Sequence, residues 1–301
     1  MSIEVIRFVD DRGDVQVGVR SKGAGEAHLL PFNSLSDLLQ LTANALESAI
    51  QEALKAGESR SVSRLLPPID GHTEVWAAGV TYKRSRTARE EESEQPDIYS
   101  RVYDAARPEL FFKSVAWRVV GDGEPVGVRD DSAINTPEPE IALVCNSHAE
   151  IVGVTICNDV SSRSIEGENP LYLPQAKVYS GSCAVGPSFV PMSQISDIYA
   201  LNIDVAVKRD GAIAWSGSTS TSEMHRKFEE LVEYLFLHMD FPEGVILSTG
   251  TGAVPSMEFN LTTDDEVSVG ISEVGTLTNR VLPARRASFS WLTPDIKRNG
   301  L

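Results

Sequence analysis

The sequence predicts a mainly β protein with a few helices, in the α+β class. Many short segments either alternate apolar and polar residues or stay apolar for only a few positions, as strands do. Turn-forming residues separate these segments, and only a few stretches carry a helical pattern. The order of elements is not the strand–helix–strand alternation of a doubly wound parallel sheet. With 301 residues and an apolar fraction of 42%, the chain is long enough to bury a large core.

The N-terminal segment predicts a small domain. Residues 3–9 and 14–20 alternate apolar and polar side chains around a polar turn that ends in Gly13, which is typical of a hairpin. A helical pattern then runs over residues 36–56, and Gly57 follows it as a helix-ending residue often does. Residues 61–70 contain two adjacent prolines and are expected to form a linker. We therefore expect a small N-terminal domain at 1–70 and a larger domain at 71–301.

The larger domain is expected to consist mostly of strands. Residues 161–168 and 222–239 carry helical patterns, and the charged segment 82–104 is expected to be a helix that either faces solvent or acts as a mobile lid. The expected strands cover residues 75–80, 110–113, 116–120, 124–129, 138–145, 150–158, 200–208, 211–216, 244–248, 265–271 and 275–282.

Composition excludes several classes of protein. The formal net charge of −16, with no basic run to offset it, argues against a nucleic-acid binder. No stretch approaches the roughly 18 apolar residues of a membrane span, and the N-terminus lacks the pattern of a secretory signal. The three cysteines (Cys145, Cys157 and Cys183) are expected to be buried core residues without disulfides, which fits a reducing cytoplasm.

Three carboxylates are the strongest functional candidates. Glu138 and Glu140 start an apolar strand, where side chains two apart point to the same face. If residues 150–158 fold back beside 138–145, Asp159 returns to the same end. Such a group is costly unless a cation compensates it, and oxygen ligands suit Mg²⁺, Mn²⁺ or Ca²⁺. In the alternative interpretation, Pro137 and Pro139 mark an edge where both glutamates face solvent.

Two further segments could belong to the same site. Lys177 lies in a mostly apolar loop, so its amine either reaches water along the surface or is partly desolvated and suited to act as a base. The glycine-bearing turn at 248–255 offers backbone N–H groups and hydroxyls to a carboxylate, although an ordinary loop would have the same composition. The chain contains no GxSxG motif and no phosphate-binding loop.

Residues from about 75 to 282 resemble the fumarylacetoacetate hydrolase superfamily. The matching motifs are 76–82, 110–113, Glu138-Pro139-Glu140, 158–163, Lys177, Gly186-Pro187 and 249–251. Segments 107–109 and 166–177 are most similar to the sugar-acid dehydratases of this superfamily, which include 2-keto-3-deoxy-D-arabinonate dehydratase. The resemblance implies mixed β-sheets rolled into a sandwich-like body behind a small N-terminal α+β domain.

The resemblance also implies an active site. It assigns Mg²⁺ (or Mn²⁺ or Ca²⁺) to Glu138, Glu140 and Asp159, with a small-molecule 2-oxo acid bound to the metal. It assigns catalytic roles to Lys177 and to Glu109, the acidic residue of the dehydratases. It assigns substrate binding to Thr251, Gly250 and Arg163. A homodimer or homotetramer without nucleic-acid or membrane partners is the implied assembly.

One departure favours dehydration over hydrolysis. Hydrolases of this superfamily usually carry Asn-Tyr-x-x-His, whose histidine helps to activate water, but here the corresponding residues are Thr81-Tyr82-Lys83-Arg84-Ser85. The implied reaction is loss of water from 2-keto-3-deoxy pentonates, such as 2-keto-3-deoxy-D-arabinonate or D-xylonate, to give 2,5-dioxopentanoate. An acylpyruvate or diketo-acid hydrolase, an oxaloacetate decarboxylase, a 2-hydroxydienoate isomerase and a non-catalytic metal-binding structural protein remain as alternatives.

Overall fold

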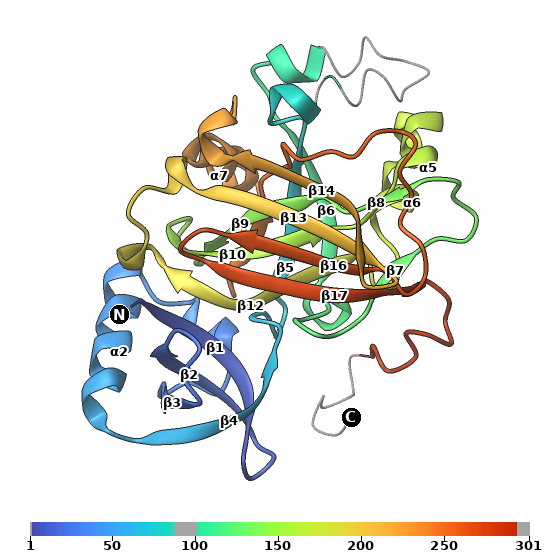
Figure 1. Cartoon of the computed structure of the whole chain (residues 1–301). Helices are drawn as coiled ribbons and strands as arrows, with labels where there is room; N and C mark the ends of the chain where they lie inside the picture. The colour runs from blue at the N-terminus through green and yellow to red at the C-terminus, as the bar shows by residue number, and fades with distance from the viewer. Residues whose placement is uncertain (1, 86, 88–100, 294–301) are drawn as a thin grey trace.

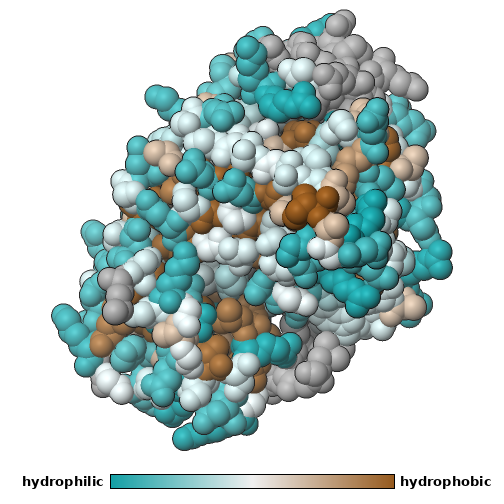
Figure 2. All heavy atoms as spheres, viewed as in Figure 1, coloured by the Kyte–Doolittle hydropathy of each residue, from teal (hydrophilic) through white to brown (hydrophobic). Residues whose placement is uncertain are grey.

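The computed structural model describes residues 2–85, 87 and 101–293 (Figure 1). Two sheets, one of ten strands and one of five, pack on each other around the main hydrophobic core. The apolar side chains that alternate along the strands meet in this layer, which is why the fold is mainly β as predicted. Across the face drawn in Figure 2, hydrophobic residues gather only in small patches among hydrophilic ones.

The ten-stranded sheet runs in the order β2-β3-β4-β1-β12-β10-β9-β15-β5-β6. Its strands are β1 (Ile3–Asp10), β2 (Val15–Ser21), β3 (Glu26–Leu29), β4 (Ser59–Leu66), β5 (Glu74–Gly79), β6 (Glu109–Val115), β9 (Pro139–Cys145), β10 (Ile151–Asp159), β12 (Cys183–Pro191) and β15 (Val245–Ser248).

The five-stranded sheet runs in the order β14-β13-β16-β17-β7, and β8 pairs with β11 separately. These strands are β7 (Val126–Val128), β8 (Asn135–Thr136), β11 (Ser161–Ser162), β13 (Asn202–Arg209), β14 (Ala212–Ser220), β16 (Glu266–Ile271) and β17 (Gly275–Pro283).

The helices are short and lie outside the two sheets (Figure 1). The α-helices are α1 (Leu35–Leu38), α2 (Ala43–Ala56), α5 (Arg163–Glu168), α6 (Leu173–Lys177) and α7 (Phe228–Phe236). The 3₁₀ turns are η1 (Ala116–Arg118), η2 (Pro170–Tyr172), η3 (Met192–Gln194), η4 (Ile198–Ala200) and η5 (Thr221–Glu223). In the part of the chain that the structure describes, no helix is long and apolar enough to cross a membrane.

Strands β1 to β4, with α1 and α2, form an N-terminal lobe. Each of the four strands pairs with two others of the group, so the strands close into a ring. A separate hydrophobic cluster lies between this ring and α2. The lobe joins the rest of the sheet where β1 pairs with β12 at Val5 and Phe189. The expected linker at 61–70 is wrong in its first half, because β4 runs to Leu66 and closes the ring. The boundary at residue 70 stays a prediction.

Three other predicted elements differ from the structure. The helix expected at 36–56 is interrupted, because the hydroxyl of Thr42 caps a new helix, α2, which ends at Gly57 as predicted. The helix expected at 222–239 is reduced to α7, because Met224 bridges Tyr82 before it and residues 237–239 are exposed after it. The strand expected at 116–120 begins instead as the 3₁₀ turn η1.

Strand β12 was not predicted, although it lies at the centre of the ten-stranded sheet. Its Gly186 and Pro187 argue against a central strand. The ladder with β10 is irregular at this point, between Val154 and Ile156, so the missing N–H of proline is accommodated. All three cysteines are buried and free, as expected. The charged segment 82–104 lies mostly outside the described residues.

Candidate active site

Glu138, Glu140 and Asp159, the acidic trio, meet where β9 starts and β10 ends. In this antiparallel pair Glu140 lies opposite Cys157, and the N–H of Asp159 donates to the carbonyl of Glu138 at 3.0 Å. One carboxylate oxygen from each residue lies within 4.8 Å of the others. All three side chains are buried, so the alternative in which both glutamates face solvent is excluded. The convergence expected from the hairpin is present.

The turn after β15 fixes the orientation of Glu140. Its carboxylate accepts hydrogen bonds from the hydroxyl of Ser248 at 2.5 Å and from the N–H of Gly250 at 2.7 Å. Gly250 has a φ of +90°, and a Cβ atom there would lie 2.1 Å from Oγ1 of Thr81, so this position requires glycine. Gly250 and Thr251, to which the resemblance assigned substrate binding, both line the cavity. The N–H of Gly250 donates to Glu140 of the acidic trio.

The site holds more buried negative than positive charge. A fourth buried carboxylate, Glu166, lies near the trio, and among the described residues the buried ammonium groups beside it are those of Lys113 and Lys177. Burial, reinforced by the neighbouring carboxylates of Asp159 and Glu138, raises the pKa of Glu140 well above its usual range. The formal excess of two negative charges and the all-oxygen donor set fit a divalent cation such as Mg²⁺.

Lys177, at the end of α6, contacts the trio directly. Its Nζ donates to Glu138 at 2.7 Å, to Asp159 at 3.0 Å and to the hydroxyl of Ser161 at 2.6 Å. The ring of Phe111 covers it, with the ring centroid 5.6 Å from Nζ. The side chain is only 2% exposed. Of the two interpretations left open by the sequence, the desolvated lysine is therefore the one present.

Lys113, on β6, is a second buried lysine that the sequence analysis did not identify. It forms an ion pair with Asp159 and donates to the backbone carbonyls of Val160 at 3.1 Å and Lys177 at 2.6 Å. It thus connects a residue of the trio to the backbone that carries Lys177. A charged residue within the apolar run of β6 was the available signal, because a lysine in a buried strand needs a partner.

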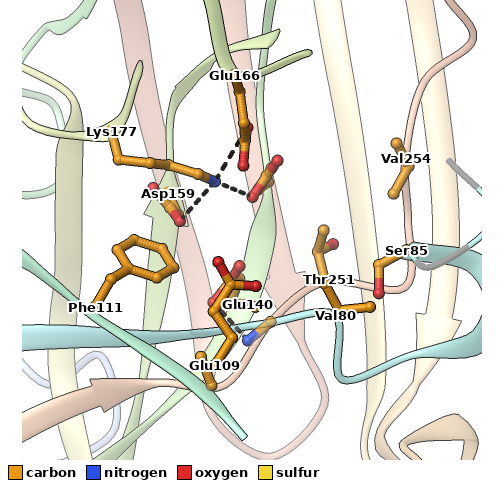
Figure 3. A pocket seen from close by; sticks show the side chains of 14 residues that line it. Val80, Ser85, Glu109, Phe111, Glu140, Asp159, Glu166, Lys177, Thr251 and Val254 are labelled. Carbon is orange, nitrogen blue, oxygen red and sulfur yellow. Dashed lines mark hydrogen bonds and ion pairs between the residues drawn. The ribbon is translucent and has the colours of Figure 1, made fainter. Parts of the chain in front are cut away.

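A cavity opens beside the trio (Figure 3). Two carboxylates extend into it from opposite sides of the view, Glu166 next to Lys177 and Glu109 near Glu140. Glu109 is the acidic residue that the resemblance predicted, and it lines the cavity. Glu166, 4.0 Å from Lys177, was not predicted as a site residue, although it begins the segment 166–177 that resembles the dehydratases.

Arg163, predicted to bind substrate, is not among the residues that line the cavity. Its guanidinium is buried and donates to the backbone carbonyl of Pro255 at 2.6 Å. This bond ties α5, which carries Glu166, to the loop that carries Thr251. Arg163 therefore contacts the loop beside the cavity, and its role in binding substrate stays a prediction.

Ser85 occupies the place where the superfamily's hydrolases carry histidine. It lines the cavity, but its hydroxyl donates to the carbonyl of Tyr82 at 2.7 Å and accepts from the N–H of Tyr82 at 3.1 Å. A serine hydroxyl engaged in a local turn is not a base for activating water. The site therefore has an acidic trio that could hold a metal ion, two buried lysines and two further carboxylates, without a histidine at this place.

Comparison with known proteins gives consistent matches. Residues 74–282 match the protein family described as "Fumarylacetoacetate (FAA) hydrolase C-terminal". A relative from Haloferax volcanii named "Probable 2-keto-3-deoxyxylonate dehydratase" is 50% identical over 214 residues, covering 71% of this chain and 73% of the relative. A relative from Saccharolobus solfataricus named "2-dehydro-3-deoxy-D-arabinonate dehydratase" is 43% identical over 240 residues, covering 78% and 80%.

Among solved structures, a 2-keto-3-deoxy-D-arabinonate dehydratase complexed with magnesium and 2,5-dioxopentanoate matches with a TM-score of 0.78 and 35% identity. The match covers 95% of this chain and 100% of that chain. The likeness therefore extends over the N-terminal lobe as well as over the sheets that carry the site.

Proposed function

Because the chain belongs to the fumarylacetoacetate hydrolase family, we propose that it is a Mg²⁺-dependent hydro-lyase that dehydrates 2-keto-3-deoxy sugar acids. For pentonates such as 2-keto-3-deoxy-D-arabinonate or D-xylonate, the product is 2,5-dioxopentanoate. The observation that carries the proposal is the buried acidic trio with Lys177 bonded to two of its members. The dehydratase names of two relatives at 50% and 43% identity support the substrate class.

In this proposal Glu138, Glu140 and Asp159 hold the divalent cation. Their charge excess favours a cation, and the bonds from Ser248 and Gly250 hold Glu140 in one orientation. When bound, the cation supplies Lewis-acid chemistry at the ketone of a 2-oxo acid, which makes the hydrogens on the adjacent carbon more acidic.

Lys177 is the proposed base. Its amine takes a proton from C3 of the substrate, next to the ketone. Burial suits this role, since the amine is held beside the trio by defined contacts and is covered by Phe111. A lysine at the surface would be solvated and free to adopt many orientations.

Glu109 is the proposed acid. It gives a proton, directly or through a water molecule, to the hydroxyl on C4, which leaves as water. Loss of the C3 proton and of this hydroxyl forms a C3–C4 double bond conjugated to the ketone. Loss of a proton from C5 and gain of one at C3 move this double bond to C4–C5, and the resulting enol loses its hydroxyl proton and gains one at C4 to give the terminal aldehyde of 2,5-dioxopentanoate. Glu109 lines the same cavity as Lys177, as this division of roles requires.

Product analysis tests the proposal. The purified protein with Mg²⁺ is incubated with a panel of 2-keto-3-deoxy pentonates and hexonates, and the products are identified by mass. Loss of one water, abolished by EDTA and restored by added Mg²⁺, is the expected result. Two fragments, release of carbon dioxide, or a shifted double bond at constant mass would instead indicate a hydrolase, a decarboxylase or an isomerase. EDTA that alters only thermal stability, with no turnover of any substrate, would indicate a metal-binding structural protein.

We further propose that the enzyme works in the cytoplasm as a homodimer or homotetramer. Three buried free thiols fit a reducing compartment. The assembly is checked by light scattering coupled to size-exclusion chromatography, which gives the mass of the particle in solution.

A further inference from the structure

Gly79 and Glu109 lie directly opposite each other in the sheet. Gly79 ends β5, Glu109 begins β6, and their Cα atoms are partners in the antiparallel ladder. Directly opposite residues direct their side chains to the same face. A Cβ atom placed on Gly79 would lie 2.1 Å from Oε2 of Glu109 and 2.6 Å from its Cδ. The carboxylate of Glu109 therefore fills the space that a side chain at position 79 would need.

We propose that Gly79 is a positioning residue for catalysis, because its missing side chain determines where the carboxylate of Glu109 lies in the cavity. The inference rests on the proposed role of Glu109 as the acid. Both residues line the same cavity, and Figure 3 shows Glu109 near Glu140. Gly79 belongs to a regular strand and has no left-handed φ, so its backbone does not require glycine. The requirement comes from the neighbouring carboxylate.

The backbone around Gly79 is held too firmly to make room. Strand β5 pairs with β15 up to Ala77 and with β6 up to Gly79 itself. The next residue, Val80, has a φ of 54°, which is rare for a β-branched residue and indicates a strained turn. Thr81 anchors that turn, since its hydroxyl donates to the carbonyl of Thr249 at 2.6 Å and its carbonyl accepts from the N–H of His225 at 2.8 Å.

The end of the Glu109 side chain is therefore the part that gives way. Rotation about the side-chain bonds of Glu109 can move its carboxylate, whereas the backbone of the strand is constrained by hydrogen bonds. An added methyl group at position 79 should displace this carboxylate and leave the fold intact. Displacement of a catalytic group by about 1 Å is enough to reduce a rate by about 100-fold.

The test is the variant Gly79→Ala, assayed with Mg²⁺ and a 2-keto-3-deoxy pentonate. We expect kcat to fall about 10- to 100-fold while KM changes little, because the substrate's binding groups are untouched. Gly270→Ala is the matched control: it also lies in a strand, its nearest neighbour to an added Cβ is 3.8 Å away, and its kcat should stay unchanged. A Gly79→Ala enzyme with wild-type kcat would overturn the proposal.

A double-mutant cycle asks whether the loss acts through Glu109. In the background Glu109→Ala there is no carboxylate to displace, so Gly79→Ala should lower the residual kcat by less than about twofold. An equal loss in both backgrounds would mean that residue 79 acts by another route and would contradict the inference.

A crystal structure of Gly79→Ala separates this inference from the proposed function. The expected structure keeps the backbone of β5 and shows the carboxylate of Glu109 moved away from residue 79. A carboxylate in its original place beside a shifted strand would overturn the inference. If Glu109→Ala alone retained full activity, the assigned role of Glu109 would fail, and the crystal structure would still decide the steric coupling.

Discussion

The N-terminal lobe and the active site both bury charged side chains, but they balance them differently. In the lobe, one carboxylate meets one guanidinium: Glu4 accepts from Arg20 at 2.8 Å, from the N–H of Gly23 at 3.1 Å and from the hydroxyl of Ser188 at 2.6 Å. In the site, four buried carboxylates lie beside two buried lysines.

This difference indicates that the buried charges of the lobe serve the fold, whereas those of the site serve to bind a ligand. In the lobe, the negative charge of Glu4 is compensated by Arg20, so this pair needs no ligand. The acidic trio is not neutralised by the described residues around it. Burial, reinforced by the neighbouring carboxylates, raises the pKa of Glu140, and an added cation would compensate the negative charge. Substitutions should therefore have opposite consequences in the two regions.

The largest effect is expected from Lys177→Met. Removal of the proposed base should lower kcat by about 1,000-fold or more, in the upper range for acid–base catalysis. Binding of Mg²⁺ should survive, because the three carboxylates remain. Arg20→Met is the control in the lobe: it should lower the free energy of unfolding by about 3 kcal/mol and leave kcat of the folded enzyme unchanged. Undiminished activity of Lys177→Met would remove its role as base.

Lys113→Met should affect stability and metal binding together. Removing this ammonium takes away one of the two lysines that pair with Asp159 and leaves two backbone carbonyls without this donor, at a cost of about 3 kcal/mol in the metal-free protein. Added Mg²⁺ should recover part of the loss. Chemical denaturation with and without Mg²⁺ measures both quantities. A metal-free stability equal to that of the wild type would show that Lys113 does not hold the site together.

The same substitution should have opposite signs in the two regions. Glu140→Gln removes an excess negative charge, so we expect the metal-free protein to gain on the order of 1 kcal/mol while the stabilisation by Mg²⁺ disappears. Glu4→Gln removes half of a balanced pair and should cost about 3 kcal/mol with or without Mg²⁺. Thermal unfolding compares the two variants. If both variants destabilised the metal-free protein, the two regions would not differ in how their buried charge is balanced.

The smallest effect concerns pH. Because the pKa of Glu140 is raised in the fold above its usual 4.5, the folded state binds more protons than the unfolded state from that pH upward. The metal-free protein should therefore lose stability from this source as pH rises through the folded pKa. Mg²⁺ displaces the proton, so its stabilising effect should grow with pH. Thermal unfolding at about pH 5 and about pH 8 with and without Mg²⁺ checks this, using Glu140→Gln as the control.

Part of this site is predictable from sequence for a clear reason. The trio follows from strand periodicity and a hairpin, since both are local rules that place Glu138, Glu140 and Asp159 at one end. Lys177 and Glu109 required the resemblance, because no local pattern connects them to the trio. The N-terminal hairpin and most strands of the larger domain were predicted in the same local way.

Other features depend on tertiary contacts that no local pattern shows. Strand β12 contains Gly186 and Pro187 and is stabilised by contacts with segments distant in the sequence, including the strands on either side. Lys113 is a site residue because the carboxylate of Asp159 and the backbone carbonyls of Val160 and Lys177 reach it. The role of Gly79 becomes visible only when Glu109 is seen across the ladder, since a glycine at the end of a strand commonly marks nothing more than a turn.

The most direct measurement is anomalous diffraction at the manganese edge from crystals soaked in Mn²⁺, which accepts the same oxygen ligands as Mg²⁺. We expect one strong anomalous peak enclosed by the carboxylates of Glu138, Glu140 and Asp159, and no such peak in crystals of Glu140→Gln. No peak between these side chains, or a peak elsewhere in the molecule, would contradict it.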